Sequence, residues 1–110
     1  MRRPPVLDQA SLDTWCAAHP AWTLAHGHLV RVVRLASHRA AADVVVAQVA
    51  IADRLDHHAV VTLIDREVRI ELWTHDRGGV TELDLAFASD FDQVLAALSP
   101  PGDPTTPSTW

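Results

Sequence analysis

Residues 60–98 read VVTLIDREVRIELWTHDRGGVTELDLAFASDFDQVLAAL, and two hydrophobic periods follow one another within this stretch. The first part holds two segments rich in β-branched residues, 60–64 and 68–74, which are joined around Asp65 and Arg66. In the second segment apolar and polar residues alternate, which is typical of a strand with one buried face. We therefore predict a β-hairpin over these residues.

The rest of the stretch has the period of a helix. After Gly78 and Gly79 the apolar residues recur mostly at three- and four-residue spacing, as Val80, Leu83, Phe87, Phe91, Val94, Leu95 and Leu98. Spacing of this kind gathers apolar side chains on one side of a helix. It is the strongest amphipathic pattern in the chain, and it predicts a helix after the hairpin.

Upstream, a shorter helix and another hairpin are expected. Asp8 can cap a helix that Pro20 ends. Residues 22–24 and 29–35 then flank Gly27, and glycine permits the positive φ of a tight turn. This arrangement predicts a second β-hairpin.

A further helix is expected between the two hairpins. Ser37 offers a cap for the run through Asp53, whose apolar residues surround most of the helix circumference. The three valines at 44–46 would suit a strand equally well. Helix is the prediction for this segment, and strand is the alternative.

The predicted order of elements is α-β-β-α-β-β-α. Hairpins beside helices that can cover one face predict an α+β fold, an antiparallel four-stranded sheet with helices on one face. A chain of 110 residues with 48% hydrophobic content suffices for one core, so one domain is expected over residues 1–98. Residues 99–110 are rich in Pro, Ser and Thr and are predicted to be a disordered tail.

Composition narrows the classes of partner. The net charge is −5, and the nine basic residues, all arginine, are scattered along the chain, so we expect no direct nucleic-acid partner. No segment approaches the roughly 20 apolar residues that cross a bilayer, so no membrane partner is expected. Cys16 is the only cysteine, which excludes an internal disulfide and favours a cytoplasmic localisation.

Polar motifs lie near the ends of the predicted elements. They are Asp53-Arg-Leu-Asp-His57-His58, Thr74-His75-Asp76-Arg-Gly78-Gly79 and Thr81-Glu-Leu-Asp84. In residue types and spacing these motifs resemble the signature region of pterin-4a-carbinolamine dehydratases, and the similarity extends over about residues 12–98. The chain departs from that family's usual pattern at four positions: Ala59 in place of Pro, Asp53 in place of Glu, and Val61 and Asp65 in a region that usually bears an aromatic residue.

The resemblance implies dehydration of a 4a-hydroxytetrahydropterin to the quinonoid dihydropterin, as in tetrahydrobiopterin recycling, without a cofactor or a metal. It implies four catalytic residues, namely His57, His58, His75 and Asp84. It implies that Asp53, Thr74 and Asp76 bind the pterin substrate. Trp73 is a further candidate for substrate binding, as a platform on which the pterin stacks, and packing in the core is the alternative. Histidine, with an ordinary pKa of about 6.5, can act both as general acid and as general base near neutrality.

Local geometry adds conditions to this set. Neighbouring residues on a helix point about 100° apart, so His57 and His58 can face one ligand only from an irregular helix end. By the period of a strand, His75 should share a face with Glu71 and Trp73 rather than with the apolar residues between them.

Asp84 lies near the apolar side of the last helix, where a carboxylate is costly unless it is hydrogen-bonded. The motif Thr81-Glu-Leu-Asp84 resembles a capping box, in which Asp84 would accept from backbone donors of the first turn. A carboxylate in this position can also be aimed at a histidine, and the sequence leaves both interpretations open.

The sequence also leaves two alternative functions open, and it predicts an oligomer. The chain could be a non-catalytic assembly or dimerisation partner that resembles the dehydratases, or it could hold a metal with His57, His58, His75 and Asp84. A four-stranded sheet has edge strands that need cover, and the family joins its subunits through sheets and helices. A homodimer or homotetramer is therefore expected.

Overall fold

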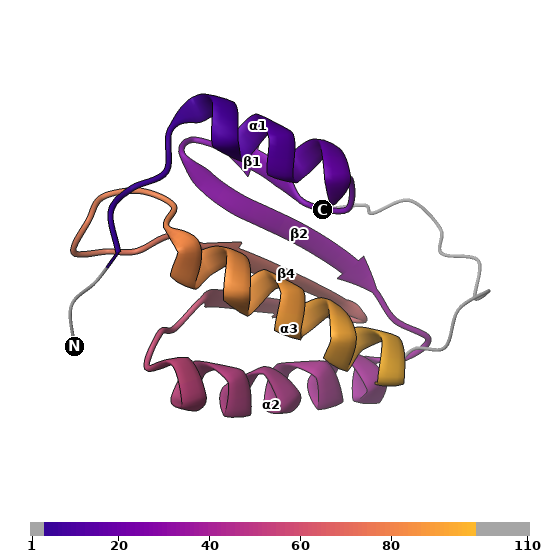
Figure 1. The fold of residues 1–110 in the computed structure, drawn as a ribbon. Coiled ribbons are helices and arrows are strands. Elements are labelled where there is room, and N and C mark those ends of the chain that lie inside the picture. Colours follow the sequence, from indigo (N-terminus) through magenta and orange to yellow (C-terminus); the bar gives the residue numbers. More distant parts are fainter. Residues whose placement is uncertain (1–3, 99–110) are drawn as a thin grey trace.

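The computed structural model describes residues 4–98, in which three helices lie on one face of a four-stranded antiparallel sheet (Figure 1). The elements are α1 (Gln9–Ala18), β1 (Thr23–Ala25), β2 (His28–Arg34), α2 (His38–Leu55), β3 (Val60–Ile64), β4 (Glu67–Leu72) and α3 (Glu82–Leu98). The predicted α+β class and the order α-β-β-α-β-β-α are confirmed. The predicted tail at 99–110 and the first three residues of the predicted domain lie outside the described residues.

The strands follow the order β1-β2-β4-β3 across the sheet. In this register Leu29 lies opposite Leu72, and Val61 lies opposite Ile70. Residues that face each other across an antiparallel pair point to the same side of the sheet, and both of these pairs pack in the core. The helix-covered face of the sheet therefore forms one wall of the core.

Both predicted hairpins form, with small differences at their ends. His26 and Gly27 have φ angles of 53° and 77°, which are typical of the two-residue turns that suit the twist of a hairpin. The first strand begins at Thr23, because Trp22 lies in the preceding turn with its indole buried. The last strand ends at Leu72, two residues earlier than the alternation predicts, and Thr74 forms an isolated bridge to Gly79.

The valine-rich segment is helical, as predicted. Ser37 caps α2 by accepting the N–H of Ala40. Val44 is fully buried against the core, whereas Val46 and Val49 are 70% and 48% exposed. The burial of one side of the helix outweighs the strand preference of valine.

The phenylalanines of α3 form the centre of the core. Phe87 and Phe91 are fully buried, and the Trp22 indole meets the Phe91 ring edge-on with 6.1 Å between the centroids. The indole N–H of Trp22 donates to the carboxylate of Asp92, which also pairs with Arg31 of β2. These contacts fix α3 across the sheet, and so they fix the position of its first turn.

The cap of α1 gives the first prediction. The N–H of Ser11 donates to the Asp8 carboxylate, and this hydrogen bond lowers the Asp8 pKa below its ordinary value of 3.8. A lowered pKa stabilises the fold at neutral pH, and this contribution is lost as the pH falls through the folded-state pKa. Asp8→Ala should therefore lower the melting temperature by a few degrees at pH 7, and the difference from the wild type should shrink below pH 3.8.

Asp8→Asn is the matched control, because asparagine keeps an oxygen that can accept the Ser11 N–H. Thermal unfolding followed by circular dichroism at several pH values measures all three proteins. An Asp8→Ala protein that melts like the wild type at neutral pH would contradict the role of this cap.

Candidate functional site

A pocket of about 200 Å³ opens where the end of α2 meets the loop that follows β4. Five residues line it: Asp56, His57, His58, His75 and Asp76. Sheet pairing explains the meeting of these two segments. Val60, at the start of β3, lies opposite Glu71, near the end of β4, so the residues just before β3 lie beside those just after β4.

The end of α2 is irregular, as the sequence analysis requires. Asp56 adopts a left-handed conformation with φ 49° and ψ 47°, a region that Asp tolerates better than most residues. The N–H of His57 then donates to the carbonyl of Ala52 at 3.0 Å, which closes a helix end of the Schellman type. This turn sends the two neighbouring histidines into different environments, since His57 is 5% exposed and His58 is on the surface.

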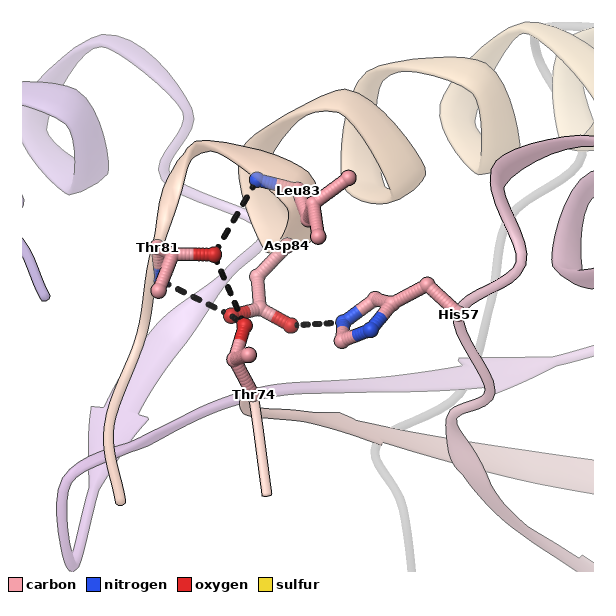
Figure 2. Close-up of polar contacts among 5 residues, drawn as sticks. All are labelled: His57, Thr74, Thr81, Leu83 and Asp84. Carbon is pink, nitrogen blue, oxygen red and sulfur yellow. Dashed lines mark hydrogen bonds and ion pairs between the residues drawn. The ribbon is translucent and has the colours of Figure 1, made fainter. Parts of the chain in front are cut away.

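Asp84, in the first turn of α3, is completely buried and reaches toward this helix end (Figure 2). Its Oδ1 atom lies 2.5 Å from Nε2 of His57. Its Oδ2 atom accepts the N–H of Thr81 at 2.8 Å, and the N–H of Leu83 donates to the Thr81 hydroxyl. Both interpretations of Asp84 are therefore confirmed in its contacts, because one carboxylate caps α3 and also holds a histidine.

In the hydrogen bonds around Asp84, the donor and the acceptor of each bond can be assigned. The Thr74 hydroxyl donates to Oδ2 of Asp84, so the Thr81 hydroxyl is left to donate to Thr74 at 2.7 Å. A carboxylate only accepts, which requires Nε2 of His57 to carry a proton. In a neutral His57 ring, the other nitrogen, Nδ1, is therefore an acceptor.

His75 lies in a tight loop between β4 and α3. Thr74 pairs with Gly79, and the N–H groups of Arg77 and Gly78 donate to the Thr74 carbonyl. The loop is packed from outside by the N-terminal segment, since a Cβ at Gly79 would lie 2.9 Å from Val6. His75 is exposed at the tip of this loop, and its ring stacks on Trp73, with 4.3 Å between the centroids.

The remaining predicted site residues occupy three different environments. Asp76 lines the pocket, whereas Asp53 is exposed on α2 and is not among the lining residues. Thr74 is buried, with its hydroxyl bonded to Asp84, and Trp73 is half-buried beneath the His75 ring. Sequence reasoning did not single out Asp56, although an Asp directly before the histidine pair is a suitable residue for a left-handed helix end.

Within residues 4–98, no three His, Cys, Asp or Glu side chains are arranged so that they could hold a metal ion. In the same part of the chain, none of the helices is long and apolar enough to cross a membrane.

The comparisons with known proteins bear directly on this site. The sequence pattern of the family described as "Pterin 4 alpha carbinolamine dehydratase" matches residues 5–94. The chain belongs to this family. The match confirms the resemblance inferred from the histidine and aspartate motifs, and it includes every residue of the pocket.

Curated relatives in the family are similar over nearly their whole length. A protein of Chloroflexus aurantiacus is 35% identical over 83% of this chain and 98% of its own length. One of Streptomyces coelicolor is 41% identical over 82% of this chain and 90% of its own length. Both carry the name "putative pterin-4-alpha-carbinolamine dehydratase".

A solved structure from Brucella melitensis, described as a transcriptional coactivator/pterin dehydratase, has the same fold as the present chain. The TM-score is 0.77, and the match covers 81% of this chain and 97% of that chain at 23% sequence identity.

The contacts of Asp84 lead to a prediction about the His57 ring. In Asp84→Asn, an amide nitrogen turned toward His57 would donate a hydrogen bond where the carboxylate accepted one. The His57 ring would then carry its proton on Nδ1 instead of Nε2, so that Nε2 can accept. We expect nitrogen-15 NMR to detect this change of tautomer, and we expect the dehydratase rate to fall by about 10²-fold or more. The melting temperature should change little, because the side chain keeps its size and one acceptor oxygen.

Asp92→Asn is the matched control, since Asp92 lies on the same helix and is bonded to Trp22 and Arg31 rather than to the pocket. It should lower the melting temperature and leave both the His57 tautomer and the rate unchanged. An Asp84→Asn protein with full turnover and a lowered melting temperature would contradict the prediction and would leave Asp84 with the role of a helix cap alone.

Proposed function

We propose that this protein dehydrates 4a-hydroxytetrahydropterin to quinonoid dihydropterin by histidine acid and base catalysis, within tetrahydrobiopterin recycling in the cytoplasm. The observation that carries the proposal is that His57, His58 and His75 line one pocket while Asp84 fixes the tautomer of His57. Membership of the family supports the same reaction.

The reaction needs one proton delivered and one removed. The C4a–O bond breaks, its electrons leave with the hydroxyl group, and an acid protonates that group so that it departs as water. A base takes the proton of a ring nitrogen, and that electron pair forms the new double bond. The reaction transfers no electrons to another molecule, so acid and base groups of the chain can supply what it needs.

The three histidines differ in a way that suits these two tasks. In its neutral form His57 has an acceptor at Nδ1, because Asp84 holds the Nε2 proton, so His57 is suited to act as base. His58 and His75 are exposed, and water can return a proton to either of them after it has been given away. We assign the acid role to this exposed pair.

The carboxylates that line the pocket can accept hydrogen bonds from the donor groups of the pterin ring. A pterin ring carries an amino group and ring N–H groups, which donate hydrogen bonds, and Asp56 and Asp76 offer acceptors in the lining. A volume of about 200 Å³ is below the roughly 300 to 1,000 Å³ typical of sites for drug-sized ligands and suits a small bicyclic ring. We propose Asp56 and Asp76 as substrate-binding residues.

The decisive experiment measures dehydration of freshly generated 4a-hydroxytetrahydropterin by absorbance, above the spontaneous rate. The wild type should accelerate it, and His57→Ala, His58→Ala and His75→Ala should each lower kcat, with about 10²-fold expected for His57→Ala. His38→Ala is the control, because His38 is exposed at the opposite end of α2 from the pocket. A wild type with no acceleration over the spontaneous reaction would refute the proposal.

The second candidate function is a non-catalytic partner that keeps the dehydratase fold. The observation in its favour is Ala59, which stands after the histidine pair where the family usually has Pro. Such a protein would keep the pocket and lose the rate, so the absorbance assay separates it from the enzyme.

We also propose a homodimer or homotetramer. Val60 and Ile64 of the edge strand β3 are 42% and 52% exposed, and the helix-free face of the sheet has further exposed apolar surface at Val32. Unpaired strand edges and exposed apolar side chains are commonly covered by a second copy. Sedimentation at micromolar concentration should give a mass of two or four chains, and a monomer there would contradict this expectation.

A further inference from the structure

A column of three stacked rings stands beside the pocket. The His28 ring lies on the Trp73 indole, with 3.9 Å between the centroids and 6° between the planes. The His75 ring lies on the same indole, with 4.3 Å between the centroids and 3° between the planes. One tryptophan thus connects a histidine of the sheet to a histidine of the pocket.

The sheet holds the outer end of this column. The Nδ1 atom of His28 lies 2.5 Å from Oε2 of Glu71, so the carboxylate accepts the ring N–H and fixes the orientation of the imidazole. His28 and Trp73 come together because Leu29 and Leu72, their neighbours in the sequence, are paired across β2 and β4. Glu71 and His28 belong to regular strands, which hold side chains more firmly than a loop does.

The inner end of the column has little else to hold it. His75 is exposed in the loop between β4 and α3, and among the contacts of residues 4–98 its ring makes the stacking contact with Trp73 and no hydrogen bond. An exposed side chain without such a contact moves between rotamers on a picosecond to nanosecond timescale. The stack on Trp73 is therefore the contact that selects the orientation of His75.

We propose that Glu71, His28 and Trp73 are positioning residues that hold the His75 ring at the pocket for proton transfer. The proposal deepens the dehydratase function proposed above and rests on it. It gives Trp73 a role other than direct contact with the pterin, because its ring surface already carries two imidazoles.

The chain contains a second stack of the same kind that serves as an internal control. His19 lies on Trp15 with 4.0 Å between the centroids and 14° between the planes, at the end of α1. Neither residue lines the pocket of the three histidines. His19→Ala therefore removes one imidazole from one tryptophan, as His28→Ala does, without touching the proposed support of His75.

The experiment compares His28→Ala, His28→Phe, Trp73→Leu and His19→Ala with the wild type. NMR of the His75 ring protons reports the stack directly, because an indole face shifts them upfield. Steady-state kinetics report its consequence. Aromatic pairs contribute stabilisation equivalent to about two- to tenfold in a population, so His28→Ala should lower kcat by that factor and leave KM within about twofold.

Trp73→Leu should abolish the upfield shift and lower kcat by at least as much as His28→Ala. His28→Phe should recover both readings in part, because phenylalanine can stack on Trp73 but lacks the hydrogen bond by which Glu71 orients the ring. His19→Ala should change neither reading. An unchanged His75 shift in His28→Ala would overturn the proposal, as would unchanged kcat in both His28→Ala and Trp73→Leu. An equal loss of kcat in His19→Ala would overturn it too.

The NMR reading separates failure of this proposal from failure of the proposed function. A wild type without turnover would refute the dehydratase function, and the His75 shifts in His28→Ala would still decide whether the column holds this ring. If the His75 shift persists in His28→Ala at full size, the support is refuted whatever the turnover.

Discussion

The carboxylate of Asp84 is completely buried. Burial of a carboxylate is costly unless its oxygens accept hydrogen bonds that replace those to water. Its two oxygens accept from the His57 ring, the Thr74 hydroxyl and the Thr81 backbone. These donors come from the end of α2, the end of β4 and the start of α3. Each of the three segments must therefore stop or turn where it does, or a buried charge loses a partner at a cost of several kcal/mol. The requirement ties the shape of the pocket to the stability of the fold.

The core determines that these three segments meet at all. Phe87 and Phe91 seat α3 across the sheet one and two turns after Asp84, so the carboxylate is carried to its partners by apolar packing. The pairing of β3 with β4 does the same for the two histidine-bearing segments. Hydrogen bonding around Asp84 then selects one arrangement among those that packing alone would allow, because a hydrogen bond is directional and an apolar contact is not.

The hydrophobic periods and caps predicted the order of elements, both hairpins and the caps at Asp8 and Ser37, since these depend on neighbours within a few residues. The apolar surroundings of residue 84 also indicated a hydrogen-bonded carboxylate. The irregular end of α2 followed from the family resemblance, which requires His57 and His58 to face one ligand. The periods and caps could not reveal the stack of His28 on Trp73 or the bond from His28 to Glu71, which lies 43 residues further along the chain. Both contacts depend on the register between β2 and β4. The early end of β4 at Leu72 was missed for a related reason, because the bridge from Thr74 to Gly79 competes with the strand and is not visible in the alternation.

The two walls of the pocket hold their histidines by different physical means. On the inner wall a hydrogen bond to a buried carboxylate fixes both the position of His57 and the nitrogen that carries its proton. On the outer wall a stacking contact fixes the plane of His75 but bonds to neither of its nitrogens, which remain open to water. A group held in one tautomer suits a single proton transfer in a defined direction, whereas a group in contact with water can regain or release its proton between turnovers. The asymmetry is one of contacts: the bond to Asp84 fixes which nitrogen of His57 carries the proton, whereas the stack on Trp73 fixes only the plane of the His75 ring.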